Sequence, residues 1–314
     1  MEQKQVAVIG AGVIGLSIAH ELAHAGHAVT VIADDHDPRD CSPLAGAVWF
    51  PYGVSLDADV IELSERTRLR FEELADASRG IARRSGRFIV RLPETDMAWT
   101  DALPGKRELT QEEVPDGALG GFRVTVPVID MSKYLVWLRA IVEQLGVRFE
   151  RRLINDLASV EADVKIVAAG LRSPELVPDA EPIIPRRGQI VRLENPGLTD
   201  WYVDDDAPGG LTYVIPRFDD IVCGGTDDAG NADAEHDPDI ETGILERVTA
   251  AMPELQGLPI VSRGVGLRPG RSEPRIEWIT DAASPTIACY GHGGAGVSMS
   301  WGCAERVADM VRER

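Results

Sequence analysis

The chain begins its first apolar run at Gln5-Val6-Ala7-Val8-Ile9 and continues directly into Gly10-Ala11-Gly12-Val13-Ile14-Gly15. A short apolar run that ends abruptly at glycine is typical of a buried parallel strand. Apolar residues then recur at helical spacing from Ile14 until Gly26 ends the pattern, and strand character returns over Ala28–Ile32. The pattern therefore predicts a strand, a glycine turn, a helix and a second strand, which is a βαβ unit with a right-handed crossover.

The glycine turn matches the spacing G-x-G-x-x-G of a dinucleotide-binding motif. Gly10 permits the tight turn, Gly12 lets a pyrophosphate approach the backbone, and Gly15 allows close packing of helix on sheet. The following helix N-terminus offers free N–H groups to phosphates. Asp34, 19 residues after Gly15, can bond ribose hydroxyls and disfavours the 2′-phosphate of NADP. The motif predicts dinucleotide binding over a purely structural glycine turn, and it leaves NAD and FAD open.

Composition sets the outer limits on function. The 314 residues favour two domains, and 32 basic against 51 acidic residues give a net charge of −19. Such a surface disfavours nucleic acid and anionic membranes, so an anionic substrate needs a local cation. The four widely spaced cysteines favour reduced thiols over a metal site. Because no apolar run reaches membrane-spanning length and no leader pattern is seen, we expect a soluble, cytoplasmic protein.

Segments typical of parallel strands occur near the start, middle and end of the chain, with antiparallel-type segments between them. We expect helices over 60–77, 131–145 and 297–311, strands over 87–91, 147–149, 164–170 and 286–290, and short antiparallel strands between 188 and 275. The predicted class is α/β with an α+β part, in which a Rossmann-like domain is interleaved with a domain built on a mixed or antiparallel sheet. The first comprises 1–50, 131–175 and 281–314, and the second comprises 51–130 and 176–280.

A second glycine loop, Tyr290-Gly291-His292-Gly293-Gly294-Ala295-Gly296-Val297-Ser298, follows a strand and opens the last helix. Two glycine loops suggest a long cofactor whose far end is also cradled by backbone. The helix N-terminus and the Ser298 hydroxyl would stabilise the negative charge of a reduced flavin. The alternative is a structural turn. His292, inside this loop, is expected to be structural rather than catalytic.

Several segments together resemble the D-amino-acid oxidase family of FAD enzymes, in family order from residue 6 to residue 304. They are the first glycine turn, Ala45-Gly46-Ala47-Val48-Trp49 with Pro51-Tyr52, Tyr134-Leu135-Val136-Trp137-Leu138, Arg187-Gly188-Gln189-Ile190, Tyr213-Val214-Ile215-Pro216, Gly266-Leu267-Arg268-Pro269, and Tyr290–Gly296 with Trp301-Gly302-Cys303. The resemblance implies FAD as cofactor and a Rossmann-like flavin domain.

The resemblance also implies the site residues. Arg268 and Tyr213 would bind the substrate carboxylate, the Gly294 carbonyl would accept the amino group, and the side-chain pocket would be lined by Val48, Phe50 and Ile215. The implied cofactor contacts are Gly10, Ala11, Gly12, Val13, Ile14, Gly15, Asp34, Asp35, Ala45, Gly46, Ala47, Val48, Leu153, Ala169, Gly293, Gly294, Gly296, Val297 and Ser298. Without the resemblance, Arg268 reads as a surface or ion-paired arginine, although a guanidinium in an apolar segment of an acidic protein suits a carboxylate.

The implied reaction is FAD-dependent oxidative deamination of neutral D-amino acids, with basic ones as an extension, to 2-oxo acids, ammonia and hydrogen peroxide. Hydride leaves Cα for flavin N5, dioxygen reoxidises the flavin, and no residue acts as acid or base. The alternatives are a glycine oxidase, a D-aspartate oxidase, a quinone-linked dehydrogenase, and a non-catalytic dinucleotide-binding protein. Whether the chain forms a homodimer stays open.

The chain departs from the family at three places. The loop over 204–212 is short and carries no aromatic residue, which predicts a more open site with weaker lid gating. Asp227 follows Gly-Gly-Thr where D-aspartate oxidases typically have arginine, and it would repel an acidic side chain. Asp35 and Ala169 replace a common arginine and a small hydroxyl residue, so cofactor contacts there are expected to differ from the family pattern.

Overall fold

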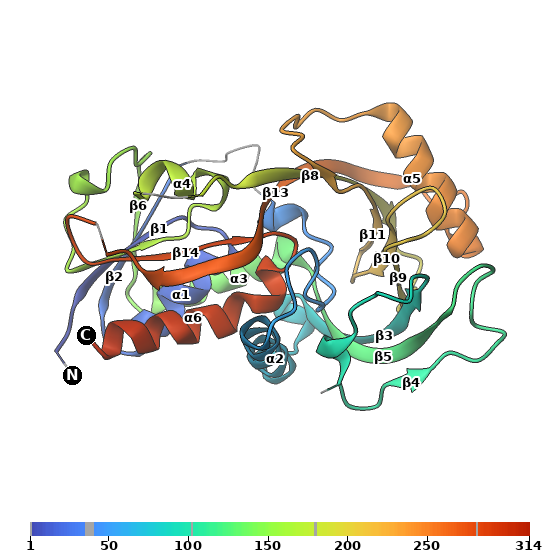
Figure 1. Ribbon diagram of the computed structural model, residues 1–314, viewed down its shortest axis with the longest axis horizontal. Coiled ribbons are helices and arrows are strands. Elements are labelled where there is room, and N and C mark those ends of the chain that lie inside the picture. Colours follow the sequence, from blue (N-terminus) through green and yellow to red (C-terminus); the bar gives the residue numbers. More distant parts are fainter. Residues whose placement is uncertain (1, 35–40, 102, 179–180, 281) are drawn as a thin grey trace.

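The computed structural model describes residues 2–34, 41–101, 103–178, 181–280 and 282–314 (Figure 1). In this part of the chain, 14 strands form one sheet in the order β4-β5-β3-β9-β10-β11-β8-β13-β14-β7-β1-β2-β6, with β12 paired to β8. The strands are β1 (Gln5–Ile9), β2 (Ala28–Ala33), β3 (Ile81–Val90), β4 (Arg107–Glu108), β5 (Gly120–Ile129), β6 (Arg148–Arg151), β7 (Val164–Val167), β8 (Ile184–Glu194), β9 (Trp201–Asp204), β10 (Thr212–Pro216), β11 (Asp220–Gly224), β12 (Asp228–Ala229), β13 (Ile260–Trp278) and β14 (Thr286–His292).

The helices cover both halves of this sheet. They are α1 (Val13–His24), α2 (Ala58–Glu73), α3 (Met131–Gln144), α4 (Ser173–Leu176), α5 (Pro238–Ala251) and α6 (Gly296–Arg312), with short 3-10 turns η1 (Ser42–Leu44), η2 (Ala77–Arg79), η3 (Ala98–Thr100), η4 (Leu157–Ser159), η5 (Gly170–Arg172) and η6 (Pro253–Leu255). Among the described residues, none of these helices is both long and apolar enough to cross a bilayer.

The half drawn at the left of Figure 1 is the expected Rossmann-like unit. Strands β14, β7, β1, β2 and β6 pair in parallel in that order. Their alternating side chains enter two separate cores, because successive residues of a strand face opposite sides of the sheet. Val6 and Val8 join the core under α1, α3 and α6, whereas Ala7 and Ile9 join a smaller core with the segment 154–177. Both faces are thus covered, as a parallel sheet requires.

The other half of the sheet is mixed. Strands β8, β11, β10 and β9 are antiparallel neighbours, β3 runs parallel to β9, and β5 runs antiparallel to β3. The long strand β13 joins the halves: Ile260–Gly270 pairs with β8, and the stretch from Gly270 to Trp278 pairs with β14. In Figure 1 it runs as one continuous ribbon between them. The sheet therefore passes unbroken through the expected domain boundaries, which remain a prediction.

Several predicted elements have different bounds. The second helix begins at Ala58 because the Asp57 carboxylate caps it by accepting from Val60 N at 2.8 Å, and it ends at Glu73 rather than residue 77. The strand expected over 87–91 is part of β3, which starts at Ile81. The region 188–275 contains β8, α5 and the 19-residue β13, not only short strands. Some of its glycines mark close approaches, as Gly188 and Gly224 do, whereas Gly209 and Gly257 lie in turns between elements, as expected.

Candidate functional site

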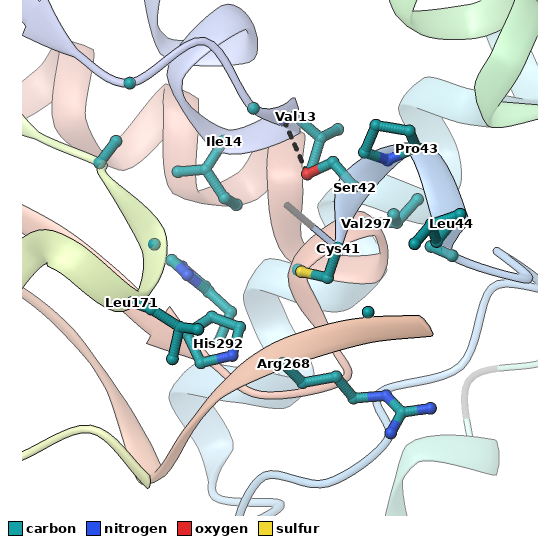
Figure 2. Close-up of a pocket in the computed structure, with 18 of the residues that line it drawn as sticks. Val13, Ile14, Cys41, Ser42, Pro43, Leu44, Leu171, Arg268, His292 and Val297 are labelled. Atoms are coloured by element: carbon teal, nitrogen blue, oxygen red, sulfur yellow. Dashed lines mark hydrogen bonds between the residues drawn. The ribbon is translucent and has the colours of Figure 1, made fainter. Parts of the chain in front are cut away.

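One cavity of about 1100 Å³ joins the two halves of the sheet and extends from Asp34 to Arg268. Nearly all the residues predicted for the cofactor and substrate line it: Gly10, Ala11, Gly12, Val13, Ile14, Asp34, Ala45, Gly46, Ala47, Val48, Phe50, Leu153, Ala169, Tyr213, Ile215, Arg268, Gly293, Gly294, Gly296, Val297 and Ser298. Gly15 does not line it, and Asp35 lies outside the described residues. Figure 2 shows Val13 and Ile14 on one side and Arg268, from β13, on another.

The first glycine turn owes its shape to close backbone contacts. Gly10 has φ +117°, and a Cβ there would lie 2.3 Å from the Ala168 carbonyl oxygen. A Cβ on Gly15 would lie 2.0 Å from the Gly10 carbonyl oxygen, so this glycine serves packing of α1 against the turn. Gly12 leaves space toward the cavity, and among the described residues only Ser42 Oγ lies near, at 3.2 Å from its ideal Cβ. The tight turn at Gly10 and the packing contact at Gly15 are present, and the role of Gly12 toward a pyrophosphate stays a prediction.

Ser42 is a cavity residue that the sequence did not single out. It begins η1, and its Oγ accepts a hydrogen bond of 3.3 Å from Val13 N in the first turn of α1 (Figure 2). The first turn of a helix carries N–H groups without intrahelical partners, and a hydroxyl is a common partner for them. The serine therefore closes one side of the turn at which a pyrophosphate was expected.

The far end of the cavity is lined by Asp34, which follows β2, and by Leu153 and Ala169. Asp34 is exposed, and Leu153 is 46% exposed although apolar. Arg151 and Arg152 line the same end. The acidic side chain can accept hydrogen bonds from hydroxyl groups, and the two basic side chains can offset the negative charge of a nucleotide in an otherwise acidic protein.

The segment after η1 crosses the cavity in an unusual conformation. Ala47 has φ +56°, a left-handed value that side chains other than glycine rarely adopt. The conformation is held on both sides: Ile129 N donates to the Ala47 carbonyl at 2.9 Å, and Trp49 N donates to the Pro127 carbonyl at 2.8 Å. Backbone in a costly conformation at a cavity wall is a common property of ligand-binding segments.

Ser298 lines the cavity, and its hydroxyl bonds the backbone of Phe50. Its Oγ donates to the Phe50 carbonyl at 2.8 Å and accepts from Phe50 N at 3.0 Å. Since a hydroxyl has one proton, its donor capacity is used by Phe50 in this structure, and a contact of Ser298 with the cofactor stays a prediction. Ser298 ties the first turn of α6 to the segment that carries Phe50. Helix α6 still presents its N-terminus to the cavity through Gly296 and Val297.

The second glycine loop depends on close approaches of its own. A Cβ on Gly294 would lie 2.4 Å from the Tyr52 ring, and one on Gly293 would lie 2.6 Å from the Gly53 carbonyl oxygen. Gly293 also has φ +51°. Only glycine therefore allows this loop to lie against the Tyr52 segment, which brings the Gly294 backbone to the cavity wall.

Arg268 reaches the cavity across β8. A Cβ on Gly188 would lie 2.5 Å from both terminal nitrogens of its guanidinium, so the bare backbone of Gly188 is the surface on which the guanidinium rests. Arg268 Nη1 donates to the Thr226 carbonyl at 3.1 Å and lies 3.4 Å from Asp227 Oδ1. Because these contacts engage chiefly Nη1 and the side chain is 16% exposed, the guanidinium can still offer donors to an anion in the cavity.

Tyr213 lies beside Arg268 in the same wall. Its ring packs on Gly224 and Gly225, whose ideal Cβ atoms would lie 2.1 Å and 2.9 Å from the nearest tyrosine atoms. Burial raises the pKa of its hydroxyl, and the positive charge of Arg268 partly offsets this. The hydroxyl is therefore protonated at neutral pH and can donate to a carboxylate held by Arg268. Ile215, Val48 and Phe50 add an apolar wall, as expected.

Asp227 does not line the cavity but lies behind Arg268. Its carboxylate accepts from Arg186 Nε at 2.8 Å and from the Tyr52 hydroxyl at 2.7 Å. Although burial opposes it, these hydrogen bonds and the charge of Arg268 hold the pKa of Asp227 below its ordinary value. Asp227 is thus paired with two arginines, and its repulsion of an acidic substrate side chain stays a prediction.

A buried thiol and imidazole cluster adjoins the second glycine loop. Cys303 Sγ lies 3.5 Å, and Cys289 Sγ 4.0 Å, from His292 Nε2, and the three ligand atoms lie within 4.8 Å of one another. Two thiols and an imidazole could hold a thiophilic metal ion such as Zn²⁺. The sequence favoured reduced thiols and no metal; its only signal was Cys-x-x-His followed by a cysteine 11 residues later. His292 thus has contacts suited to a structural role.

Comparisons with known proteins agree with this geometry. The sequence matches the family described as FAD dependent oxidoreductase over residues 5–310. It is 38% identical over 309 residues to a D-amino-acid oxidase of Rubrobacter xylanophilus, covering 97% of this chain and 94% of the relative. A D-amino-acid oxidase of Streptomyces coelicolor is 37% identical, with 98% and 96% covered.

Solved structures are similar in fold. Glycine oxidase from Geobacillus kaustophilus superimposes with a TM-score of 0.83 at 17% identity, covering 100% of this chain and 96% of that one. Iminodiacetate oxidase from Chelativorans sp. gives 0.82 at 19% identity, with 98% and 95% covered. At these identities the likeness concerns the fold.

Proposed function

The chain belongs to the family of FAD dependent oxidoreductases that includes the D-amino-acid oxidases, and from this we propose that it oxidises D-amino acids with neutral side chains, with FAD as its cofactor and dioxygen as electron acceptor. The products are the 2-oxo acid, ammonia and hydrogen peroxide. The observation that carries the proposal is Arg268: it is a cation that enters the shared cavity beside the Tyr213 hydroxyl and an apolar wall, in a protein of net charge −19.

The residues present fit FAD. The cavity has a volume of about 1100 Å³. It is lined at one end by Asp34, an acidic group suited to ribose, and at the other by the apolar wall beside Arg268, where a substrate would fit. Two helix N-termini, of α1 and α6, open on it through glycines. We propose that Gly10–Ile14 would hold the pyrophosphate, Asp34 the ribose, and the Ala45–Val48 and Gly293–Val297 segments the flavin. When bound, FAD supplies the acceptor for two electrons and a proton from the substrate, and passes the electrons to dioxygen.

The protein's part in the reaction is chiefly orientation. Arg268 would bind the substrate α-carboxylate with its planar guanidinium, and the Tyr213 hydroxyl would donate to the same carboxylate. The Gly294 carbonyl would accept from the amino group, which fixes the remaining rotation and so the direction of the Cα–H bond. We propose no acid or base among these residues. Tyr213 stays protonated because burial raises its pKa, and it serves as a donor only.

The N-terminus of α6 is the positive end of its helix dipole. Its Gly296 and Val297 N–H groups would stabilise the negative charge of a reduced flavin in the cavity. Ser298 contributes indirectly by fixing Phe50 against this turn. The pair Phe50 and Trp99, with ring centroids 5.3 Å apart, then stiffens the apolar wall that faces the substrate side chain.

Peroxide release measured with D-alanine, D-leucine, D-methionine, D-aspartate and glycine tests the proposal and its alternatives. We expect turnover of the neutral D-amino acids with one peroxide formed per 2-oxo acid. Electron transfer to a quinone without peroxide would indicate a dehydrogenase, and glycine as best substrate would indicate a glycine oxidase. D-Aspartate as best substrate would contradict the preference for neutral side chains, and bound dinucleotide without any turnover would indicate a binding protein.

The division into a flavin domain and a substrate domain, a cytoplasmic location and a homodimeric assembly complete the proposal. Limited proteolysis tests the domain boundaries, cell fractionation tests the location, and light scattering of the purified protein tests the assembly.

A further inference from the structure

Asp205 is a carboxylate in the cavity wall that the reaction described above does not use. It follows β9 directly, and with Leu211 it forms the part of the β9–β10 connection that lines the cavity, beside Val203 and Tyr213. Its Oδ1 is buried and makes no hydrogen bond within the described part of the chain. A buried polar atom without a partner costs free energy, and a ligand group in the cavity can supply that partner.

Two of the three acidic groups around Asp205, Asp204 and Asp227, are paired with arginines, whereas no ion pair of Asp205 is found among the described residues. Asp204 accepts from Arg91 Nε at 3.0 Å and from the Tyr202 hydroxyl at 3.0 Å. Asp227 is held by Arg186 and by the Tyr52 hydroxyl. Asp206, on the loop, is exposed. Arg268 is the cation of the same wall, and its contacts are to Thr226 and Asp227.

The electrostatics follow from this arrangement. Burial, together with the charges of Asp206, Asp204 and Asp227, raises the pKa of Asp205 from 3.8 to about 7. A cation placed beside it would relieve both the missing hydrogen bond and the repulsion, and would lower that pKa again. A neutral substrate side chain leaves the free-energy cost of the buried Asp205 carboxylate in place, and an anionic substrate side chain increases that cost. The cavity wall is therefore complementary to a positive group on the substrate.

We propose that Asp205 forms a subsite for the positively charged end of a substrate side chain, the ammonium of D-lysine or D-ornithine or the guanidinium of D-arginine. The proposal rests on the proposed D-amino-acid oxidation and extends it to cationic substrates. Arg268 and Tyr213 take the α-carboxylate, and a long basic side chain lies along Leu211 and Ile215 toward Asp205. Asp227, already paired with Arg186, has no free charge for this purpose.

The test compares D-arginine with D-citrulline, which has nearly the same shape and no charge. At pH 8 we expect kcat/KM for D-arginine to exceed that for D-citrulline by roughly 10- to 100-fold, and Asp205→Asn to reduce the ratio to within about threefold. Asp206→Asn, which removes the neighbouring exposed charge, is the matched control and should leave the ratio unchanged. Asp205→Ser is a second variant, and the absorbance of bound flavin shows that each variant is folded.

The pH dependence separates this role from a merely structural one. In the wild type the ratio should rise as the pH increases through about 7, because Asp205 loses its proton over that range; in Asp205→Asn it should be flat. A ratio near one in the wild type, or one that Asp205→Asn leaves unchanged, would overturn the subsite. Equal losses with both substrates would also overturn it and would place Asp205 at the α-amino group. Absence of peroxide with every D-amino acid would instead refute the proposed function.

Discussion

Substitution of Gly188 by alanine should impair substrate binding while leaving the fold intact. The ideal Cβ of residue 188 lies 2.5 Å from Nη1 and Nη2 of Arg268 and 2.6 Å from its Cζ, far closer than carbon and nitrogen atoms approach one another. The guanidinium must therefore move by about 1 Å to reach ordinary contact. Because it is the end of a flexible side chain, it can move at small cost, so the strain is relieved by displacing the group that would bind the carboxylate.

The size of the effect follows from the interaction that is lost. A hydrogen bond to a charged group contributes about 1.5–3 kcal/mol, and 1.4 kcal/mol corresponds to a factor of ten. We therefore expect kcat/KM of Gly188→Ala with D-methionine to fall roughly 10- to 150-fold. The flavin content and the free energy of unfolding in urea should stay near the wild-type values, because no backbone atom is displaced.

Gly120→Ala in β5 is the matched control. Its ideal Cβ meets no atom of the described residues within 4 Å, so the substitution adds the same methyl group to a strand glycine without a close contact. Steady-state kinetics on the three proteins decide the matter. A Gly188→Ala enzyme with kcat/KM within about threefold of the control would show that the position of this guanidinium does not limit catalysis, and would refute the role of Arg268 as the carboxylate anchor.

Three further predictions concern stability. Gly15→Ala should lower the free energy of unfolding in urea by about 1–3 kcal/mol, because its Cβ would meet the rigid Gly10 carbonyl at 2.0 Å; a change below about 0.5 kcal/mol would contradict that contact. Ser298→Ala should lower the same quantity by about 1–2 kcal/mol through loss of both Phe50 hydrogen bonds, with kcat changed by less than threefold; a tenfold loss of kcat at unchanged stability would restore the direct role toward the flavin. The raised pKa of Asp205 means that the folded protein binds a proton between pH 4 and 7 that the unfolded chain has released, so stability falls as the pH rises through this range. Urea unfolding at pH 5 and pH 8 should show a smaller decrease for Asp205→Asn than for the wild type, and equal decreases would contradict the raised pKa.

The nucleotide-binding half was predictable because its determinants are local. The turn from Gly10 to Gly15 has the backbone form that its spacing predicts, with ideal Cβ atoms on Gly10 and Gly15 meeting backbone at 2.3 Å and 2.0 Å, and the approach of a pyrophosphate at Gly12 stays a prediction. The place of Asp34 was also predictable from a local pattern, because it directly follows the second strand. The resemblance of segments up to residue 304 then supplied the roles of Arg268 and Tyr213; locally, only the apolar surroundings of Arg268 pointed to a carboxylate site, and nothing pointed to Tyr213.

What could not be predicted depends on strand register and on contacts between distant segments. Gly266 in β13 pairs with Gly188 in β8. Arg268 lies two residues further along β13, so it faces the same side of the sheet as Gly188, which leaves room for its guanidinium. Ser298 bonds Phe50 across 248 residues of sequence, so its hydroxyl could not be assigned from the loop alone. Asp205 was one of three consecutive aspartates, and only the fold distinguishes the one in the cavity wall from the one paired with Arg91.

The visible spectrum of the purified protein under anaerobic addition of D-alanine and of L-alanine tests the central claim most directly. The account predicts bound flavin whose absorption bands are bleached by D-alanine, recover on admission of air with release of hydrogen peroxide, and do not respond to L-alanine. A protein without bound flavin after addition of FAD, or flavin bands bleached equally by both enantiomers, would contradict it.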